Sequence, residues 1–105
     1  MIYEHRIYRV PEGRMPDILS RFENITFGLF DRHGIKVSGF WTRKDANELI
    51  YLCEFESEEA METAWDAFRA DPEWIAARER TEANGPIVDE VISDVLIPTS
   101  FSPMQ

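Results

Sequence analysis

The spacing of hydrophobic residues along this chain switches between a strand-like alternation and a helix-like period of three or four residues. The order of these segments limits the fold that the chain can adopt. Residues 2–10 alternate in the manner of a β-strand. After turn residues at 11–13, hydrophobic residues recur every three or four positions, which predicts a helix from about Pro16 to His33-Gly34. The positions of this apolar stripe are Met15, Ile18, Phe22, Ile25 and Leu29.

Two strands and a second helical region come next. Residues 35–42 and 48–56 are rich in β-branched and aromatic residues, and the polar segment between them predicts a hairpin. Ser57 is expected to cap a helix, and Asp71-Pro72 restarts the helical pattern, which continues to Asn84-Gly85-Pro86. Residues 87–97 predict the last strand.

This order, β-α-β-β-α-β, predicts an α+β fold of the ferredoxin-like kind, a four-stranded antiparallel sheet with the helices on one face. With 105 residues and no long linker, the chain is expected to form a single domain over residues 1–105. The other sheet face would be bare in a monomer, because Phe40, Trp41, Tyr51 and Phe55 supply more aromatic surface than one helical layer can shield. We therefore expect a homodimer whose sheets pack together or close into a barrel.

The charge, hydrophobicity and cysteine content of the chain limit its possible binding partners, its location and its disulfide bonds. The chain has 11 Lys and Arg against 20 Asp and Glu, and a net charge of −9 repels phosphate backbones and anionic lipids, so no nucleic-acid or membrane binding is predicted. No apolar run is long enough to span a bilayer, and the N-terminus lacks an export signal, so a cytoplasmic location is expected. Cys53, the single cysteine, excludes an intramolecular disulfide and is expected in the core.

The first strand has an unusual face that carries Glu4, Arg6 and Tyr8. A carboxylate, a guanidinium and a phenol in one row are typical of a lined polar cavity, an internal ion-pair ladder or a wet edge. Tyr51 is a candidate hydrogen-bond donor to a ligand, and Trp41 a candidate wall for a planar one. The predicted ligand-binding residues are therefore Glu4, Arg6, Tyr8, Trp41, Tyr51 and His33.

Each of these residues also has a simpler interpretation. Glu4 and Arg6 can pair with each other for purely structural reasons, and Tyr8 and Tyr51 can be core aromatics. His33 at a helix end is suited to capping, and secondarily to acid or base chemistry. The two histidines form no metal-binding motif, and glycine-rich phosphate loops are absent, so neither a metal nor a cofactor is predicted and no catalytic residue is assigned.

Six short segments also resemble the NIPSNAP domain family, in the same order along nearly the whole chain. They are Ile2–Tyr8, Arg32–Gly34, Gly39–Trp41, Phe55–Ser57, Ala70–Trp74 and Phe101–Pro103. The resemblance implies a dimeric α+β barrel. Families that share this barrel include cofactor-independent antibiotic-type monooxygenases and haem-degrading enzymes, whereas the NIPSNAP family itself has no settled catalytic mechanism to carry over.

Three hypotheses for the function stay open. The first is a dimeric small-molecule-binding protein whose barrel encloses a partly polar pocket. The second is a cofactor-independent monooxygenase or isomerase acting on a planar or phenolic substrate, with Arg6 stabilising an enolate or phenolate and His33 or Glu4 moving a proton. The third is a protein-interaction module whose barrel is filled by side chains.

Overall fold

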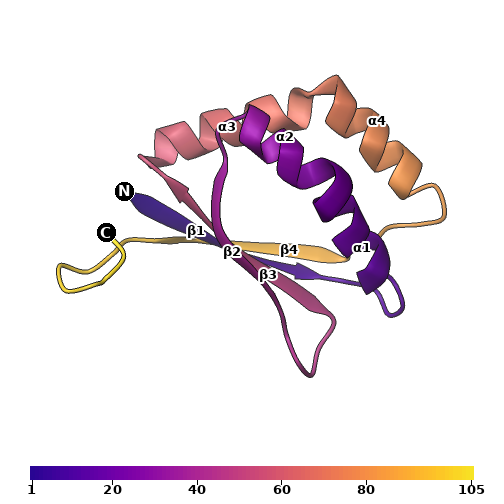
Figure 1. Cartoon of the computed structure of the whole chain (residues 1–105), viewed down its shortest axis with the longest axis horizontal. Coiled ribbons are helices and arrows are strands. Elements are labelled where there is room, and N and C mark those ends of the chain that lie inside the picture. The colour runs from indigo at the N-terminus through magenta and orange to yellow at the C-terminus, as the bar shows by residue number, and fades with distance from the viewer.

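The computed structural model describes residues 1–105 and confirms the ferredoxin-like α+β fold (Figure 1). Its four strands form one antiparallel sheet in the order β2-β3-β1-β4, and all the helices lie on one side of that sheet. The strands are β1 (Ile2–Arg9), β2 (Lys36–Thr42), β3 (Glu48–Phe55) and β4 (Glu90–Leu96). The helices are α1 (Met15–Arg21), η1 (Phe22–Thr26), α2 (Phe27–Arg32), α3 (Glu58–Ala70) and α4 (Pro72–Thr81).

The first helical region is divided into three elements. α1 and α2 are joined by η1, a π-helical turn in which the backbone N–H of Phe27 bonds to the carbonyl of Phe22. Pro16 lies in the first turn of α1, where its missing N–H removes no helical hydrogen bond. The region ends at His33-Gly34 as predicted, and Gly34 adopts a φ of +71°, which favours glycine.

The second helical region breaks where the sequence predicts. The Ser57 hydroxyl accepts a hydrogen bond from the Ala60 N–H at 3.1 Å, and a carboxylate oxygen of Asp71 accepts one from the Glu73 N–H at 2.9 Å. The segment after α4 differs from the prediction. β4 begins at Glu90 rather than near residue 87, and Ile87, which is fully buried, packs in the core instead of pairing in the sheet.

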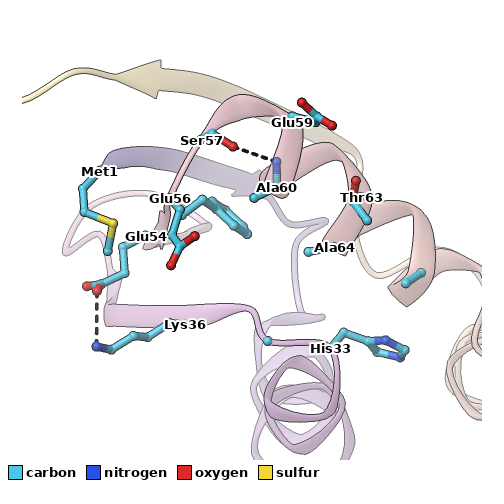
Figure 2. Close-up of a pocket in the computed structure, with 13 residues that line it drawn as sticks. Met1, His33, Lys36, Glu54, Glu56, Ser57, Glu59, Ala60, Thr63 and Ala64 are labelled. Atoms are coloured by element: carbon cyan, nitrogen blue, oxygen red, sulfur yellow. Dashed lines mark hydrogen bonds and ion pairs between the residues drawn. The ribbon is translucent and has the colours of Figure 1, made fainter.

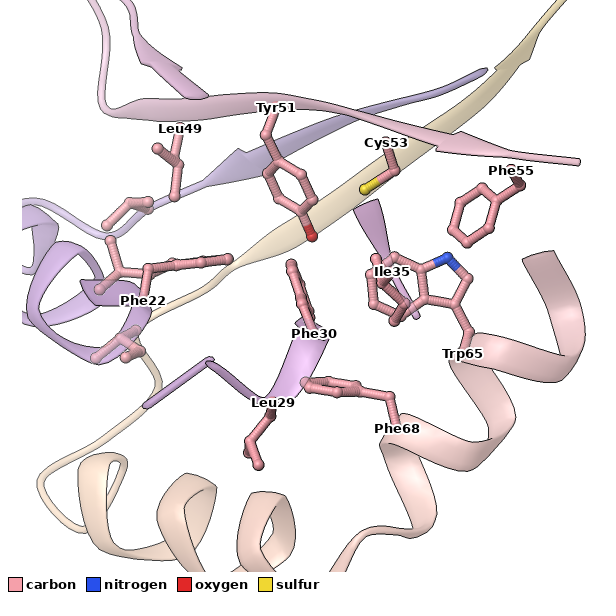
Figure 3. Packing of buried hydrophobic residues seen from close by; sticks show 13 residues of the cluster. Phe22, Leu29, Phe30, Ile35, Leu49, Tyr51, Cys53, Phe55, Trp65 and Phe68 are labelled. Atoms are coloured by element: carbon pink, nitrogen blue, oxygen red, sulfur yellow. The ribbon is translucent and has the colours of Figure 1, made fainter. Parts of the chain in front are cut away.

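The helix-covered face of the sheet combines a hydrophobic row with a polar one. Alternate residues of β3 are buried under the helices, and with residues of the helices they form one core (Figure 3). Those β3 residues are Leu49, Tyr51, Cys53 and Phe55. On the neighbouring strand β1, Tyr8, Arg6 and Glu4 lie opposite the first three of them. The polar side chains of β1 therefore face the helices.

The other face of the sheet has no helix over it. The central row across the four strands is Trp41, Ile50, Ile7 and Ile92, each paired with the next. Trp41 is 54% exposed, and its ring lies across Gly39, where an added Cβ would be 2.7 Å from the ring. The open face is therefore apolar along its centre.

This register corrects the expectation that Trp41 and Tyr51 line the same wall. Phe40, not Trp41, is paired with Tyr51, and a bulge between Val37 and Gly39 shifts the register of β2. Since neighbouring residues of a strand point to opposite faces, Trp41 lies on the open face and Tyr51 under the helices. Phe40 and Phe55 also face the helices, so Trp41 is the one predicted aromatic residue left on the open face.

Candidate functional site

Arg6 is the centre of a polar network between β1 and the helices. Its Nη1 donates to Glu4 at 2.9 Å, its Nε donates to the Tyr51 hydroxyl at 2.8 Å, and its Nη2 donates to the Tyr8 hydroxyl at 3.3 Å. The two tyrosine hydroxyls are 2.7 Å apart and hydrogen-bonded to each other. Four of the six predicted site residues are therefore in direct contact.

Glu4 connects this network to α3 and β4. One carboxylate oxygen accepts a hydrogen bond from the Trp65 indole N–H at 2.6 Å, and the other accepts from Arg6 and from the Ser93 hydroxyl. Glu4 is 2% exposed, and burying a carboxylate costs free energy unless hydrogen bonds and a charged partner compensate for it, as they do here. The Arg6 guanidinium also stacks over the Trp65 ring, with 4.3 Å between its Cζ and the ring centroid.

Burial and neighbouring groups shift the pKa values of two residues in the network, Arg6 and Tyr51. Burial works against the charged form of Arg6, but the Tyr8 and Tyr51 hydroxyls and the Glu4 carboxylate outweigh it and raise the Arg6 pKa above its ordinary value. Burial, together with Tyr8, holds the pKa of Tyr51 well above its usual range despite the opposing effect of Arg6. Arg6 therefore stays a cation near neutral pH, and Tyr51 stays a neutral phenol.

A pocket of about 290 Å³ lies beside the network, between the β1–β4 side of the sheet and helices α3 and α4. Arg6 and Tyr8 form part of its wall. The other lining residues are Trp65, Phe68 and Arg69 of α3, Trp74 and Arg78 of α4, Arg21 of α1, Glu82, Val88 and Asp89 between α4 and β4, and Glu90 and Val91 of β4. The pocket is therefore built within one chain, between the sheet and its helices.

Arg21 and Trp74 are pocket residues that the sequence does not predict as such. The signal for Arg21 is its position, three residues after Ile18 and four before Ile25, which places a charged residue inside the apolar stripe of the first helical region. The spacing of Trp74 is equally compatible with core packing, and the ring does contact Phe68, with 4.8 Å between the centroids.

The structure places His33 away from the polar network. It lies at the end of α2, where its Nε2 is 2.7 Å from the Asp71 carboxylate, which also accepts a hydrogen bond from Arg32 at 3.0 Å. The hydrogen bond from His33, the Glu73 N–H and the Arg32 guanidinium lower the pKa of Asp71. His33 thus belongs to a cluster that joins the end of α2 to the start of α4.

His33 also borders a second, wider pocket of about 700 Å³ (Figure 2). This pocket lies between the start of β2, the end of β3 and α3, and the Lys36–Glu54 ion pair at 3.2 Å closes one side of it. Its other polar lining residues are Glu56, Ser57, Glu59 and Thr63. Trp41 borders neither pocket, so the structure brings neither His33 nor Trp41 to the Arg6 network.

Neither the pockets nor the rest of the chain gathers the ligands of a metal. No group of three or more His, Cys, Asp or Glu side chains lies close enough together to hold a metal ion. None of the helices has the length and hydrophobicity that a membrane span requires.

Comparison with known proteins identifies relatives of this fold. A NIPSNAP domain protein from Burkholderia xenovorans has a TM-score of 0.85 at 24% identity, with 98% of this chain and 99% of that chain covered. A NIPSNAP family protein from Agrobacterium tumefaciens str. C58 has a TM-score of 0.88 at 21% identity, with 99% of this chain and 98% of that chain covered.

A more distant structure is a mutant of MhuD with two manganese protoporphyrin IX molecules bound per active site. It has a TM-score of 0.63 at 17% identity and covers 93% of this chain and 94% of that chain. At these identities the likeness shows the fold alone. No curated protein matches the chain. The sequence model of the NIPSNAP family matches residues 3–103, and the chain belongs to that family.

Proposed function

We propose that this protein is a homodimer that binds a small organic molecule, with one pocket in each chain between β1, β4, α3 and α4. The observation that carries the proposal is the pocket of about 290 Å³ with Arg6 and Tyr8 in its wall. Known ligand pockets run from roughly 300 to 1,000 Å³. The pocket of this protein is at the small end of that range, which suits a molecule of one or two rings.

The construction of the pocket also supports binding. Its aromatic walls come from Trp65, Phe68 and Trp74, and its fixed polar groups come from a strand rather than from a loop. Glu4, Tyr51 and Trp65 hold the Arg6 side chain from three sides, which preorganises its charge before any ligand arrives. The Arg6 side chain is 12% exposed and the Glu4 side chain 3%, so Arg6 is the more accessible member of this ion pair.

The open sheet face supports the homodimer. Its central row of Trp41, Ile50, Ile7 and Ile92 would be covered if a second copy packed sheet to sheet. Such an arrangement leaves the proposed pocket intact, because the pocket lies on the opposite side of the sheet, under the helices. A cytoplasmic location stays a prediction, based on the sequence alone.

An oxygenase or isomerase is the second candidate, and Arg6 is the feature that favours it. A charged guanidinium beside the Tyr8 hydroxyl would stabilise an enolate or phenolate. The proposed proton carriers fit less well, since both oxygens of Glu4 are occupied and His33 does not line this pocket. We therefore favour binding over catalysis, and over an interaction module with a filled interior.

Native mass spectrometry of the purified protein tests the proposal, because one spectrum reports subunit number and retained ligand. We expect a dimer with additional mass that Val91→Trp loses and Val95→Trp keeps. Val91 lines the pocket, whereas Val95 lies on the same face of β4, outside the pocket. Additional mass that both variants keep would contradict this site.

If the purified protein retains no ligand, binding is tested with a neutral aromatic probe, 2-naphthamide. Binding should quench tryptophan fluorescence, since Trp65 and Trp74 line the pocket. The Val91→Trp variant should bind the probe at least tenfold more weakly than Val95→Trp. The absence of binding to the wild-type protein, or equal binding by the two variants, would contradict the proposed pocket.

A further inference from the structure

The charges around the pocket point to the class of ligand it takes. We propose that the ligand is an aromatic carboxylate, and that its carboxylate binds Arg21 and Arg78 in exchange for Glu82. This inference rests on the proposed function because it concerns the same pocket. It follows from three observations, the burial of Arg21, the sharing of one carboxylate by two arginines, and the aromatic walls.

Arg21 is a buried cation with hydrogen-bonding capacity left over. It is 5% exposed, and its Nη1 donates to the Thr81 hydroxyl at 3.3 Å and to Glu82 at 3.0 Å. Its Nε is buried and has no hydrogen-bond partner. An unpaired buried donor costs free energy, and it is unusual in a native structure. A bidentate carboxylate would use the guanidinium more fully than the single oxygen of Glu82 does.

Arg21 and Arg78 share that single oxygen. The Arg78 Nε also donates to Glu82 Oε2, at 3.2 Å. The other two arginines of the pocket each have a carboxylate of their own, since Arg6 pairs with Glu4 at 2.9 Å and Arg69 with Asp66 at 3.3 Å. Two guanidinium groups on one carboxylate leave a local excess of one positive charge, in a chain whose net charge is −9.

The acids on the facing wall do not cancel this excess at the arginines. Glu90 pairs with Arg9 at 2.7 Å, and Asp89 is exposed to solvent, where water screens its charge. Glu82 itself follows the last residue of α4, so its side chain can turn toward water without breaking a helical hydrogen bond of the pocket wall. Glu82 is thus placed as an internal anion that a ligand can displace.

The rest of the lining selects an aromatic body. The guanidinium of Arg21 lies under the Trp74 ring, with 4.9 Å from Cζ to the centroid, and Trp74 packs against Phe68 at 4.8 Å. A flat ring attached to the carboxylate would lie along these aromatic faces. Together, the walls and the arginine pair favour an aromatic carboxylate over a phosphate or an aliphatic acid.

Two probes that share a shape but differ in charge show whether the pocket recognises the carboxylate or only the aromatic ring. Isothermal titration calorimetry is performed with 2-naphthoate and with 2-naphthamide, which differ in one charge. We expect the wild-type protein to bind 2-naphthoate at least tenfold more tightly, as a hydrogen-bonded charge pair implies. Arg78→Met should abolish this preference. Arg43→Met, which removes the same charge from the β2–β3 hairpin, should retain it.

The sharpest test is Glu82→Gln, because the displacement of Glu82 predicts a gain in affinity. This variant should bind 2-naphthoate at least threefold more tightly than the wild-type protein and bind 2-naphthamide equally well. A loss of 2-naphthoate affinity in Glu82→Gln would overturn the exchange and make Glu82 a structural partner. The side chain of Arg78 is exposed and that of Glu82 is partly exposed, so the test does not depend on a variant at buried Arg21 that could fail to fold.

The outcomes also separate this inference from the proposed function. Equal affinities for the two probes, with both blocked by Val91→Trp, would overturn the carboxylate class and leave the pocket standing. Binding of neither probe would overturn both proposals.

Discussion

Burial decides what Arg6 contributes to this protein. Its partner Glu4 is 2% exposed, so the removal of Arg6 would leave a carboxylate under the helices with only Trp65 and Ser93 as partners. Breaking one side of a buried ion pair typically costs about 3–5 kcal/mol. Arg6 is therefore expected to serve both the scaffold and the pocket.

We predict that Arg6→Met lowers the free energy of unfolding by about 3–5 kcal/mol, measured by urea denaturation. The double variant Arg6→Met, Glu4→Gln should recover part of the loss because it removes the unpaired charge. Arg43→Met is the control. It breaks an exposed pair with Glu48 and should cost less than about 1 kcal/mol. An equal cost for Arg6→Met and Arg43→Met would contradict the structural role of Arg6.

Cys53 is predicted to be unreactive in the folded protein. Burial, and secondarily the Glu4 carboxylate, raise its pKa to about 12, so the thiolate that attacks reagents is absent near neutral pH. A thiol reagent at pH 8 should modify Cys53 only after unfolding in guanidinium chloride. Because the folded pKa exceeds the ordinary value of 9.0, stability should also fall as pH rises above about 9. Rapid modification of the native protein would contradict this burial.

The sequence predicts part of the candidate site for a clear physical reason. Alternation along a strand is enough to put Glu4, Arg6 and Tyr8 on one face, and the structure confirms that placement. The register of β2 is not encoded in such a pattern, because the bulge before Gly39 moves Trp41 to the other face. The pairing of Arg21 with Glu82 joins residues 61 positions apart, which no local spacing reveals.

At the scale of elements, the spacing of hydrophobic residues predicts the order of the helices and strands, and capping residues predict where helices begin. Ser57 and Asp71 cap helices where a side-chain oxygen is expected. The η1 turn is invisible to the spacing of hydrophobic residues, since one wide turn changes the helical period little. Asp71 does more than cap α4, because its contacts with Arg32 and His33 also join α4 to the end of α2.

The Asp71 contacts predict a pH-dependent contribution to stability. The folded state lowers the pKa of Asp71 below its ordinary value of 3.8, so its contribution is present above about pH 4 and is lost as pH falls through the folded pKa. Asp71→Asn should therefore be less stable than the wild-type protein at pH 7, and the difference should shrink at pH 3. Chemical denaturation at both pH values measures it, with Asp45→Asn in the hairpin as the control. A difference that does not change with pH would contradict the ionic role.

For the whole molecule, the fold leaves the centre of one sheet face without a cover. The row of Trp41, Ile50, Ile7 and Ile92 crosses all four strands, and the helices are all on the other side (Figure 1). A protein of this size rarely leaves a continuous apolar row in water unless it contacts a partner there. The homodimer proposal thus rests on this row rather than on the larger aromatic set expected from the sequence.

Two exposed aromatic residues of similar accessibility provide the matched test of this dimer. Trp41 is 54% exposed on the open sheet face, and Phe27 is 50% exposed on α2. A buried charge would disrupt a sheet-to-sheet interface, so Trp41→Glu should be monomeric at micromolar concentration in analytical ultracentrifugation, whereas Phe27→Glu should remain dimeric. A monomeric wild-type protein would contradict the homodimer. If Phe27→Glu is monomeric and Trp41→Glu stays dimeric, the interface lies on the helices instead. The pocket between the helices and the sheet would then lie beside the partner.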